Sequence, residues 1–184
     1  MRIIAGKYKG HQLVAFKASH IRPTTDRVKE SVFNKLMSDI PGARVLDLYA
    51  GTGNLSFESL SRGAEHVDIV EMNRKSLKII EQNRSKLRIS EGLKVYGRDV
   101  FAYLRSYQGS LYDIILVDPP FTEKMAHSTM EAIAENGERL MENGIVVIES
   151  SAQERIDDEY LGFYLLDRKS FGDKTVSFFR RDVS

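Results

Sequence analysis

The chain contains no cysteine, which excludes disulfides, zinc–thiolate sites and cysteine nucleophiles. Its four histidines are scattered at positions 11, 20, 66 and 127, so an HExxH-type metal site cannot be built. No run of 18 apolar residues occurs, which excludes a transmembrane helix, and the first residues lack the apolar region of a signal peptide. We therefore expect a protein of the cytoplasm, with neither a membrane nor a metal among its partners.

The composition is that of one folded domain of ordinary size. Hydrophobic residues make up 42% and charged residues 29% of the 184 residues, which is typical of a globular protein. A chain of this length buries roughly 70% of the surface that its unfolded form exposes. We expect an extension over residues 1–42 and one compact unit over residues 43–184. The small size and the charged surface favour a monomer.

The charge is distributed unevenly although the net charge is only +1. Residues 1–35 contain eight Lys or Arg and two acids, a net charge of +6, whereas the remainder contains 19 Lys or Arg and 24 acids, a net charge of −5. This asymmetry indicates either a basic arm that binds a polyanion or a solvated amphipathic segment.

Strand-like and helix-like segments alternate along most of the chain. Apolar runs predict strands at residues 45–49, 67–71, 93–96, 112–117, 145–148, 161–167 and 174–181. Apolar residues at helical spacing predict helices at residues 25–37, from 54 to near 63, at 73–88, at 100–107 and at about 124–141. Strands separated by helices require a parallel sheet that is covered on both faces.

Two hairpins are expected at the ends of this pattern. Residues 2–16 form a short β element that turns near Gly6 and Gly10, and Pro23 separates it from the first helix. Residues 170–173 form a turn between the last two strands, which no helix separates. The expected fold class is therefore α/β: a mostly parallel, doubly wound sheet with an antiparallel edge strand, preceded by a hairpin-and-helix extension.

Four acids end or follow the first four strands of the expected sheet: Asp47, Glu71, Asp99 and Asp118. In such a sheet ligands bind outside the carboxyl ends of the strands. Any one of these acids alone is explained by a helix N-cap or a turn. Four acids aimed at one edge predict a binding site.

Gly51 and Gly53 end the first strand in a turn that lets the backbone approach a ligand closely. The dinucleotide fingerprint requires Gly or Ala three residues further on, where this chain has Ser56, and this counts against a nicotinamide cofactor. Glu71 lies 18 residues beyond Gly53, near the spacing at which an acid binds ribose hydroxyls.

Asp47 suits a cationic amino group rather than a pyrophosphate, because two anions there would repel each other. A cofactor that has both a ribose and a cationic amino-acid tail is S-adenosylmethionine. Asp99 is then placed to accept a hydrogen bond from the adenine amine.

Asp118-Pro119-Pro120-Phe121 follows the fourth strand. The two prolines stiffen the turn and remove two backbone donors, which leaves the Asp118 carboxylate and the Pro119 carbonyl as acceptors. Phe121 adds a flat ring. This set suits a planar group that bears an NH₂, with two acceptors for its N–H bonds and an aromatic face for its ring.

These motifs resemble those of class I S-adenosylmethionine-dependent methyltransferases, and the N-terminal part resembles the RsmD family in particular. The resemblance rests on residues 47–53, Glu71, Asp99, 118–121, the RIIAG at 2–6, Lys9-Gly10, Leu13, the RPTTDRVKE at 22–30 and the LSRGA at 60–64. Tyr49 and Thr52 depart slightly from the family pattern, which often has Phe and Ser there.

The resemblance implies methylation of the N2 amine of a guanine in 16S ribosomal RNA, with S-adenosylmethionine as the cofactor. The implied catalytic residues are Asp118, Pro119, Pro120 and Phe121. The implied cofactor-binding residues are Thr24, Asp47, Ala50, Gly51, Thr52, Gly53, Asn54, Glu71, Met72, Asp99, Val100 and Asp118.

The partner implied by the resemblance is 16S rRNA, within an assembly intermediate of the small ribosomal subunit. The expected RNA-binding residues are Arg2, Lys7, Lys9, Lys17, Arg22 and Arg27. The resemblance also suggests that residues 22–27 close over the cofactor. Arg27 has a second interpretation as an ion-pairing residue on a helix surface.

Three other functions remain as alternatives. An amino-methyltransferase that acts on DNA adenine N6 or on another RNA would use the same acceptors. A nicotinamide-dependent oxidoreductase is disfavoured by Ser56 and has no use for residues 118–121. A non-catalytic RNA-binding module is disfavoured because every expected site residue is present.

Overall fold

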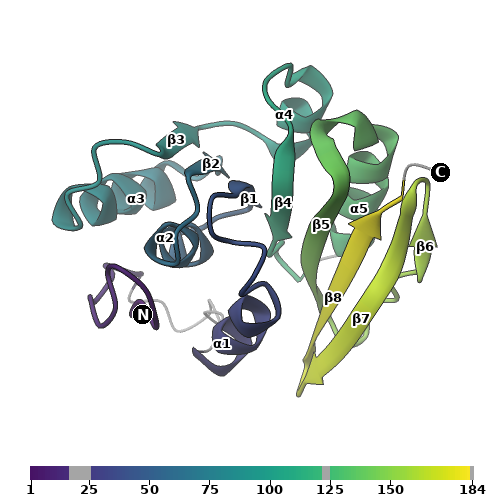
Figure 1. Ribbon diagram of the computed structural model, residues 1–184, viewed down its shortest axis with the longest axis horizontal. Helices are drawn as coiled ribbons and strands as arrows, with labels where there is room; N and C mark the ends of the chain where they lie inside the picture. Colours follow the sequence, from purple (N-terminus) through teal and green to yellow (C-terminus); the bar gives the residue numbers. More distant parts are fainter. Residues whose placement is uncertain (17–25, 122–124, 183–184) are drawn as a thin grey trace.

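The computed structural model describes residues 1–16, 26–121 and 125–182. In these ranges the chain forms an eight-stranded sheet in the order β3-β2-β1-β4-β5-β8-β7-β6, with helices on both faces (Figure 1). The strands are β1 (Arg44–Leu48), β2 (His66–Val70), β3 (Leu93–Tyr96), β4 (Tyr112–Val117), β5 (Leu140–Ser151), β6 (Glu159–Tyr160), β7 (Phe163–Phe171) and β8 (Lys174–Arg181). The helices are α1 (Asp26–Lys35), α2 (Asn54–Ser61), α3 (Arg74–Lys86), α4 (Val100–Ser106), α5 (Met125–Glu135) and one 3-10 turn, η1 (Gly137–Arg139).

The sheet is parallel from β3 to β5 and antiparallel from β8 to β6. The expected doubly wound sheet is confirmed, but its antiparallel part contains three strands rather than one edge strand. Strand β8 lies between β5 and β7, and the short β6 forms the outer edge. Only two residues long, β6 has no apolar run by which the sequence could have revealed it.

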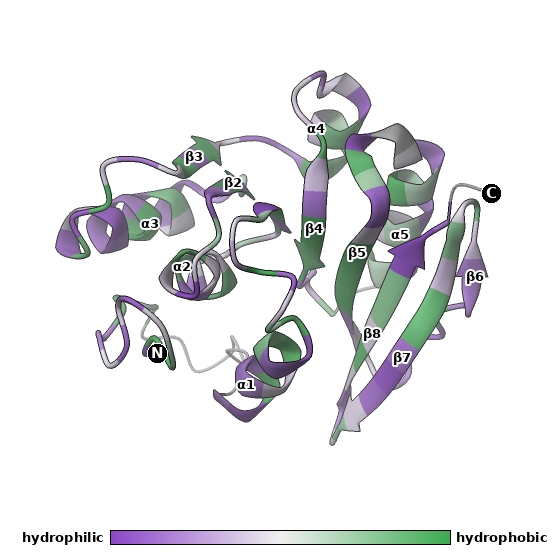
Figure 2. Cartoon of the chain, viewed as in Figure 1, coloured by the Kyte–Doolittle hydropathy of each residue, from purple (hydrophilic) through white to green (hydrophobic). Residues whose placement is uncertain are grey.

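Alternating side chains of the central strands pack into two apolar layers. In β1, Val45 packs in the layer formed with α1, α2 and α3, whereas Leu46 packs in the layer formed with α4 and α5. Strands β4 and β5 carry long apolar stretches (Figure 2), as expected for strands covered on both faces. In the described ranges no helix combines the length and the apolar character needed to cross a lipid bilayer.

The boundary between α5 and β5 differs from the expectation. Helix α5 ends at Glu135 rather than near residue 141, and β5 begins at Leu140 rather than at residue 145. Residues 141–143 are exposed although they belong to the strand, and Asn143 has a φ of 61°. The pairing register with β4 shifts here, so the strand begins with an irregular, polar segment that has no strand-like sequence pattern.

The expected N-terminal hairpin is present in a short form: an antiparallel bridge joins Arg2 to Gln12, and turns occupy the residues between them. The Ile3 amide donates to the His11 carbonyl at 3.0 Å, and the Leu13 amide donates to the Met1 carbonyl at 3.0 Å. This segment also attaches its backbone to α2. The Glu58 carboxylate accepts hydrogen bonds from the Ile4 and Ala5 amides at 2.9 and 3.1 Å. The two arms of the segment therefore pair over only a few residues, and the amides of Ile4 and Ala5 bond α2 instead.

Gly6 has a φ of 82°, and a Cβ there would lie 1.7 Å from the Ser61 carbonyl oxygen. Only glycine therefore allows the N-terminal segment to contact the end of α2 so closely. The Lys7 amide donates to that same carbonyl at 2.7 Å, and the Tyr8 amide donates to the Ser61 hydroxyl at 2.9 Å. This contact explains the glycine of the RIIAG motif and the serine of the LSRGA motif.

The expected turn between the last two strands is confirmed. Strand β7 ends at Phe171 and β8 begins at Lys174, with Gly172 in the turn at a φ of 65°. The Ala152 amide donates to the Asp173 carbonyl at 2.8 Å, which fixes this hairpin end to the end of β5. The hairpin therefore reaches the same edge of the sheet as the carboxyl ends of the parallel strands.

Candidate active site

The topology brings the four predicted acids to one edge of the sheet. Asp47 is the fourth residue of β1, Glu71 directly follows β2, and Asp118 directly follows β4. Strands β2 and β4 flank β1, with Leu48 opposite both Val70 and Val117. The glycine turn and the Asp118 turn thus leave neighbouring strands, which lie roughly 4.8 Å apart in a sheet.

The turn after β1 is held in a conformation that few residues adopt. Tyr49, Gly51 and Gly53 have φ values of 60°, 56° and 86°. Gly51 has open space around its Cα, whereas a Cβ on Gly53 would lie 2.6 Å from the Phe57 ring. Gly51 therefore suits close approach of a ligand, and Gly53 is required by packing. The Tyr49 hydroxyl shares a 2.8 Å hydrogen bond with the Thr129 hydroxyl of α5, which braces the strained turn.

Asp47 is a buried carboxylate with half of its hydrogen-bonding capacity unused. Its Oδ2 accepts a hydrogen bond from the Ser56 hydroxyl, but its Oδ1 has no partner among the described residues. Burial, the largest cause, raises the pKa of Asp47 to about 7 together with the nearby Asp118 and Glu71 carboxylates, against the opposing effect of the Ser56 hydrogen bond. Such an oxygen fits a cationic or N–H donor from a ligand.

Ser56 has a role that sequence reasoning missed. Its residue type served only as evidence against a dinucleotide cofactor, whereas in the structure it is fully buried and bonds Asp47. The signal available was its place in the first turn of the helix that follows the glycine turn.

Glu71 connects the end of β2 to the glycine turn. One carboxylate oxygen accepts from the Gly51 amide at 2.8 Å and the other accepts from the Asn73 amide at 2.7 Å. A carboxylate has about four acceptor positions, so these bonds leave capacity for ligand hydroxyls. Met72 is 69% exposed beside it and offers an apolar surface at the same edge.

Asp99 is the N-cap of α4, because its Oδ1 accepts from the Ala102 amide at 2.8 Å. Asp99 therefore has the structural role of a helix cap, and a contact to a ligand would come in addition to that role. Val100 is buried in the core, so only its backbone faces this edge. The side-chain oxygen of Asn54 accepts from the Lys29 ammonium at 2.9 Å, while Thr52 is buried and Ala50 half-buried in the turn.

Residues 118–121 present a rigid corner beside the glycine turn. The Asp118 amide donates to the Leu48 carbonyl at 3.4 Å, Pro119 is buried and Pro120 is exposed. The Phe121 ring is 41% exposed, and the Lys174 ammonium lies 4.9 Å from its centroid. Lys174 comes from the β7–β8 hairpin end and was not predicted to belong to the site.

The N-terminal basic residues have several different environments. Arg2 pairs with Asp26 at 2.9 Å and Arg27 is exposed on α1. Lys7 and Lys9 are exposed at the turn that contacts the C-terminal end of α2. Thr24, Lys17 and Arg22, which were also predicted as binding residues, lie outside the described residues.

Not all of the positive charge in residues 1–35 is available to a polyanion. Lys29 is fully buried, and its ammonium contacts Glu58 at 3.1 Å and the Arg2 carbonyl at 2.6 Å. Burial lowers the pKa of Lys29, and Glu58 opposes that shift. Lys35 pairs with Asp167 of β7 at 2.8 Å. These two cations join α1 to its neighbours.

Asn83 of α3 links the N-terminal segment to the glycine turn. Its Oδ1 accepts from the Val14 amide at 2.7 Å, and its Nδ2 donates to the carbonyls of Val14 and Thr52 at 3.0 and 3.2 Å. The residue is fully buried. A buried amide in the middle of an amphipathic helix was the available signal, since such a group needs partners.

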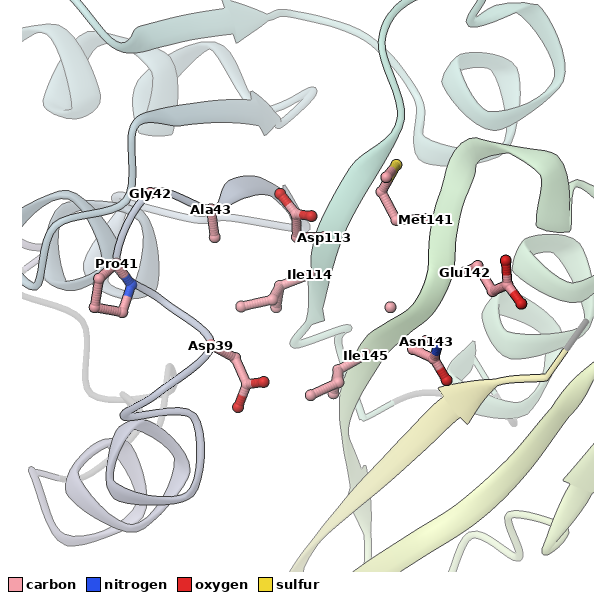
Figure 3. A pocket seen from close by; sticks show the side chains of 11 residues that line it. Asp39, Pro41, Gly42, Ala43, Asp113, Ile114, Met141, Glu142, Asn143 and Ile145 are labelled. Atoms are coloured by element: carbon pink, nitrogen blue, oxygen red, sulfur yellow. The ribbon is translucent and has the colours of Figure 1, made fainter.

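A hollow at the opposite edge of the sheet is a different kind of surface (Figure 3). It has a volume of about 230 Å³ and lies at the amino ends of β4 and β5. Asp39, Asp113 and Glu142 contribute acids to its lining, and Asp113 accepts from the Arg44 amide at 2.8 Å. Its negative charge and its position separate it from the edge that bears the predicted site.

Comparisons with known proteins agree with this arrangement. Residues 1–180 match the family model described as conserved hypothetical protein 95. The ribosomal RNA small subunit methyltransferase D of Escherichia coli strain K12 is 30% identical over 183 residues, which cover 100% of this chain and 91% of the relative. YlbH of Bacillus subtilis strain 168 is 31% identical over 183 residues, which cover 98% of this chain and 99% of the relative.

A solved structure shares the fold of this chain over its whole length. The solved structure of yhhF from Escherichia coli superposes with a TM-score of 0.88 at 29% identity, covering 100% of this chain and 99% of the other. The mixed sheet with helices on both faces is the Rossmann-like fold of class I methyltransferases. The chain therefore belongs to the family of conserved hypothetical protein 95, the RsmD family of methyltransferases.

Proposed function

We propose that this protein transfers a methyl group from S-adenosylmethionine to the exocyclic N2 amine of a guanine in 16S ribosomal RNA. The observation that carries the proposal is that two turns leave neighbouring strands at the same edge of the sheet: the first corner, at the end of β1, and the second corner, at residues 118–121. One holds the buried Asp47 with its unpartnered oxygen, and the other holds Asp118 and the exposed Phe121 ring. The relatives named as small-subunit methyltransferases support ribosomal RNA as the substrate.

The residues of the first corner fit the cofactor. The Asp47 oxygen without a partner suits the cationic amino group of its methionine part. The free acceptor positions of Glu71 suit the ribose hydroxyls, and Met72, Asp99 and the Val100 backbone would contact the adenine. When bound, S-adenosylmethionine supplies a methyl group that is already activated on a sulfonium sulfur.

The second corner suits the amine that receives the methyl group. The Asp118 carboxylate and the Pro119 carbonyl accept hydrogen bonds from the two N–H groups of the guanine amine. Such an amine is a poor nucleophile, because its lone pair is delocalised into the ring. Acceptors that favour a pyramidal nitrogen localise the lone pair toward the methyl group.

The target base must leave its stack to reach this corner. Phe121 would receive it on its exposed face, and such stacking contributes about 1–3 kcal/mol. The basic residues Arg2, Lys7, Lys9, Lys17, Arg22 and Arg27 would bind phosphates of the surrounding RNA. Lys7 and Lys9 lie near the C-terminal end of α2, a helix about 12 Å long whose other end adjoins the glycine turn, so they would contact RNA away from the target nucleotide.

An Asp118→Ala variant tests the proposal. We expect it to lose methyl transfer to small-subunit particles from a strain that lacks the enzyme, while isothermal titration calorimetry still detects cofactor binding. Nucleoside analysis of the RNA labelled by the wild type should show N2-methylguanosine. Wild-type turnover in Asp118→Ala would refute the role of Asp118, and methyladenosine as the product would refute the guanine assignment.

A further inference from the structure

The end of the β7–β8 hairpin contacts the corner that we assign to the target base. Lys174 is the first residue of β8, and its ammonium lies 4.9 Å from the centroid of the Phe121 ring. At this distance a cation over an aromatic face is attracted by the quadrupole of the ring. A segment distant in the sequence thus supplies a charged contact to Phe121.

The Lys174 ammonium is held in place rather than free to move. It forms an ion pair with Glu149 of β5 at 2.9 Å, and the two side chains are only 6% and 3% exposed. The backbone of Lys174 pairs with Ser151 in the sheet, and the hairpin end is anchored to Ala152. Side chain and backbone are therefore both fixed relative to the edge of the sheet.

A buried ion pair is not an efficient means of stabilising a fold. The cost of removing two charges from water often offsets their attraction, so apolar residues of similar volume stabilise a core equally well. The Glu149–Lys174 pair lies directly beside a ring that is 41% exposed at the candidate site. Its position points to a role at that ring.

We propose that Lys174 is a positioning residue for the methylation reaction. Its ammonium, fixed by Glu149, holds the Phe121 ring in the plane on which the target base stacks. Glu149 also neutralises the ammonium, so the site does not oppose the positive charge that passes to the amine nitrogen during methyl transfer. The inference rests on the proposed function, because it assumes that Phe121 receives a base.

Kinetics of a Lys174→Met variant test this role. RNA affinity depends mainly on phosphate contacts, so we expect the Kd for RNA and the Kd for the cofactor to stay unchanged. The base would stack less often in the reactive position, so kcat should fall about 5-fold. Lys174→Arg, which keeps the cation, should restore most of the activity. Lys169→Met removes an exposed lysine of the same hairpin and serves as the control.

A double-mutant cycle separates positioning from a general structural effect. In a Phe121→Leu background, Lys174→Met should cause no further loss of kcat, because the ring on which it acts is gone. Equal losses of kcat in both backgrounds would overturn the proposal. A Glu149→Gln/Lys174→Met variant, which leaves no unpaired buried charge, provides a folded form if the single variant is unstable.

A second measurement does not depend on methyl transfer. The chain contains eight tyrosines but no tryptophan, so Phe121→Trp introduces a single indole whose fluorescence can be excited separately from that of the tyrosines. We expect its fluorescence anisotropy to fall when Lys174→Met is added and to stay unchanged when Lys169→Met is added. Unchanged anisotropy in the Lys174 variant would overturn the proposal even if the protein methylates guanine. A fall in anisotropy without guanine methylation would count against the proposed function instead.

Discussion

Replacement of Asp47 by asparagine should stabilise the protein at alkaline pH while it removes cofactor binding. In the folded protein, burial raises the pKa of Asp47 from its ordinary value of 3.8 to about 7. Between these two values the folded form binds more protons than the unfolded form. The free energy of unfolding therefore falls as the pH rises through this range.

The size of the effect follows from the pKa shift. Each pH unit between 3.8 and about 7 costs the wild type roughly 1.4 kcal/mol, because one pKa unit corresponds to that free energy. Between pH 5 and pH 8, the wild type should lose about 3 kcal/mol relative to Asp47→Asn. Other titrating groups are shared by the two proteins, so their contributions cancel in the comparison.

Urea unfolding of both proteins at pH 5 and pH 8 measures this difference. Asp39→Asn, which removes an exposed carboxylate at the opposite edge of the sheet, controls for the change in net charge. If the free energy of unfolding of wild type and Asp47→Asn changes equally between the two pH values, the carboxylate is already ionised at pH 5 and the argument fails.

Cofactor binding should show the opposite preference for pH. A cationic amino group requires the ionised carboxylate, so affinity for S-adenosylmethionine should fall about tenfold per pH unit below the pKa of about 7. Calorimetry at pH 5 and pH 7 measures the change. Asp47→Asn should bind weakly at both values, and tight binding by this variant would remove Asp47 from the cofactor site.

Three further predictions concern two buried polar residues and one exposed arginine of the N-terminal half. Asn83→Leu should lower the free energy of unfolding by about 3 kcal/mol, since buried backbone groups lose their partners, and calorimetry should show weaker cofactor binding. Glu58→Gln leaves the buried ammonium of Lys29 without a counter-charge and should cost about 3–5 kcal/mol in urea unfolding. Arg27→Gln should reduce the slope of log affinity for RNA against log salt by about 1, whereas Arg105→Gln on α4 should leave it unchanged.

The fold was largely predictable because its central strands are apolar runs between helices. Strands β3 and β4 have the predicted bounds, since their neighbours are clear turns or polar residues. The start of β5 was missed because it is exposed and irregular. The N-terminal hairpin was predictable because two short apolar runs flank glycines, but the sequence did not indicate that the glycine at position 6 also contacts a helix.

The acids of the candidate site were predictable from topology alone, because parallel strands aim their carboxyl ends at one edge. The sequence could not show what else each residue does. Glu71 binds two backbone amides and Asp99 caps a helix, in addition to any ligand contact. Lys174 and Asn83 reach the site through pairings distant in the sequence, and no local pattern reports such contacts.

Two buried aspartates on neighbouring strands show why the open oxygen of Asp47 indicates a ligand. Asp68 of β2 is fully buried, and both of its oxygens are bonded: Oδ1 to His66 at 2.8 Å, and Oδ2 to Arg44 at 3.0 Å and Tyr112 at 2.5 Å. Asp47 is equally buried, yet its Oδ1 has no partner within the described chain. The fold is thus able to satisfy one buried carboxylate completely, and it leaves the other open one register position away, close to the binding edge. An unpartnered carboxylate oxygen at the binding edge destabilises the ligand-free protein. A cationic ligand that bonds this oxygen removes that destabilisation, and the recovered free energy contributes to its affinity.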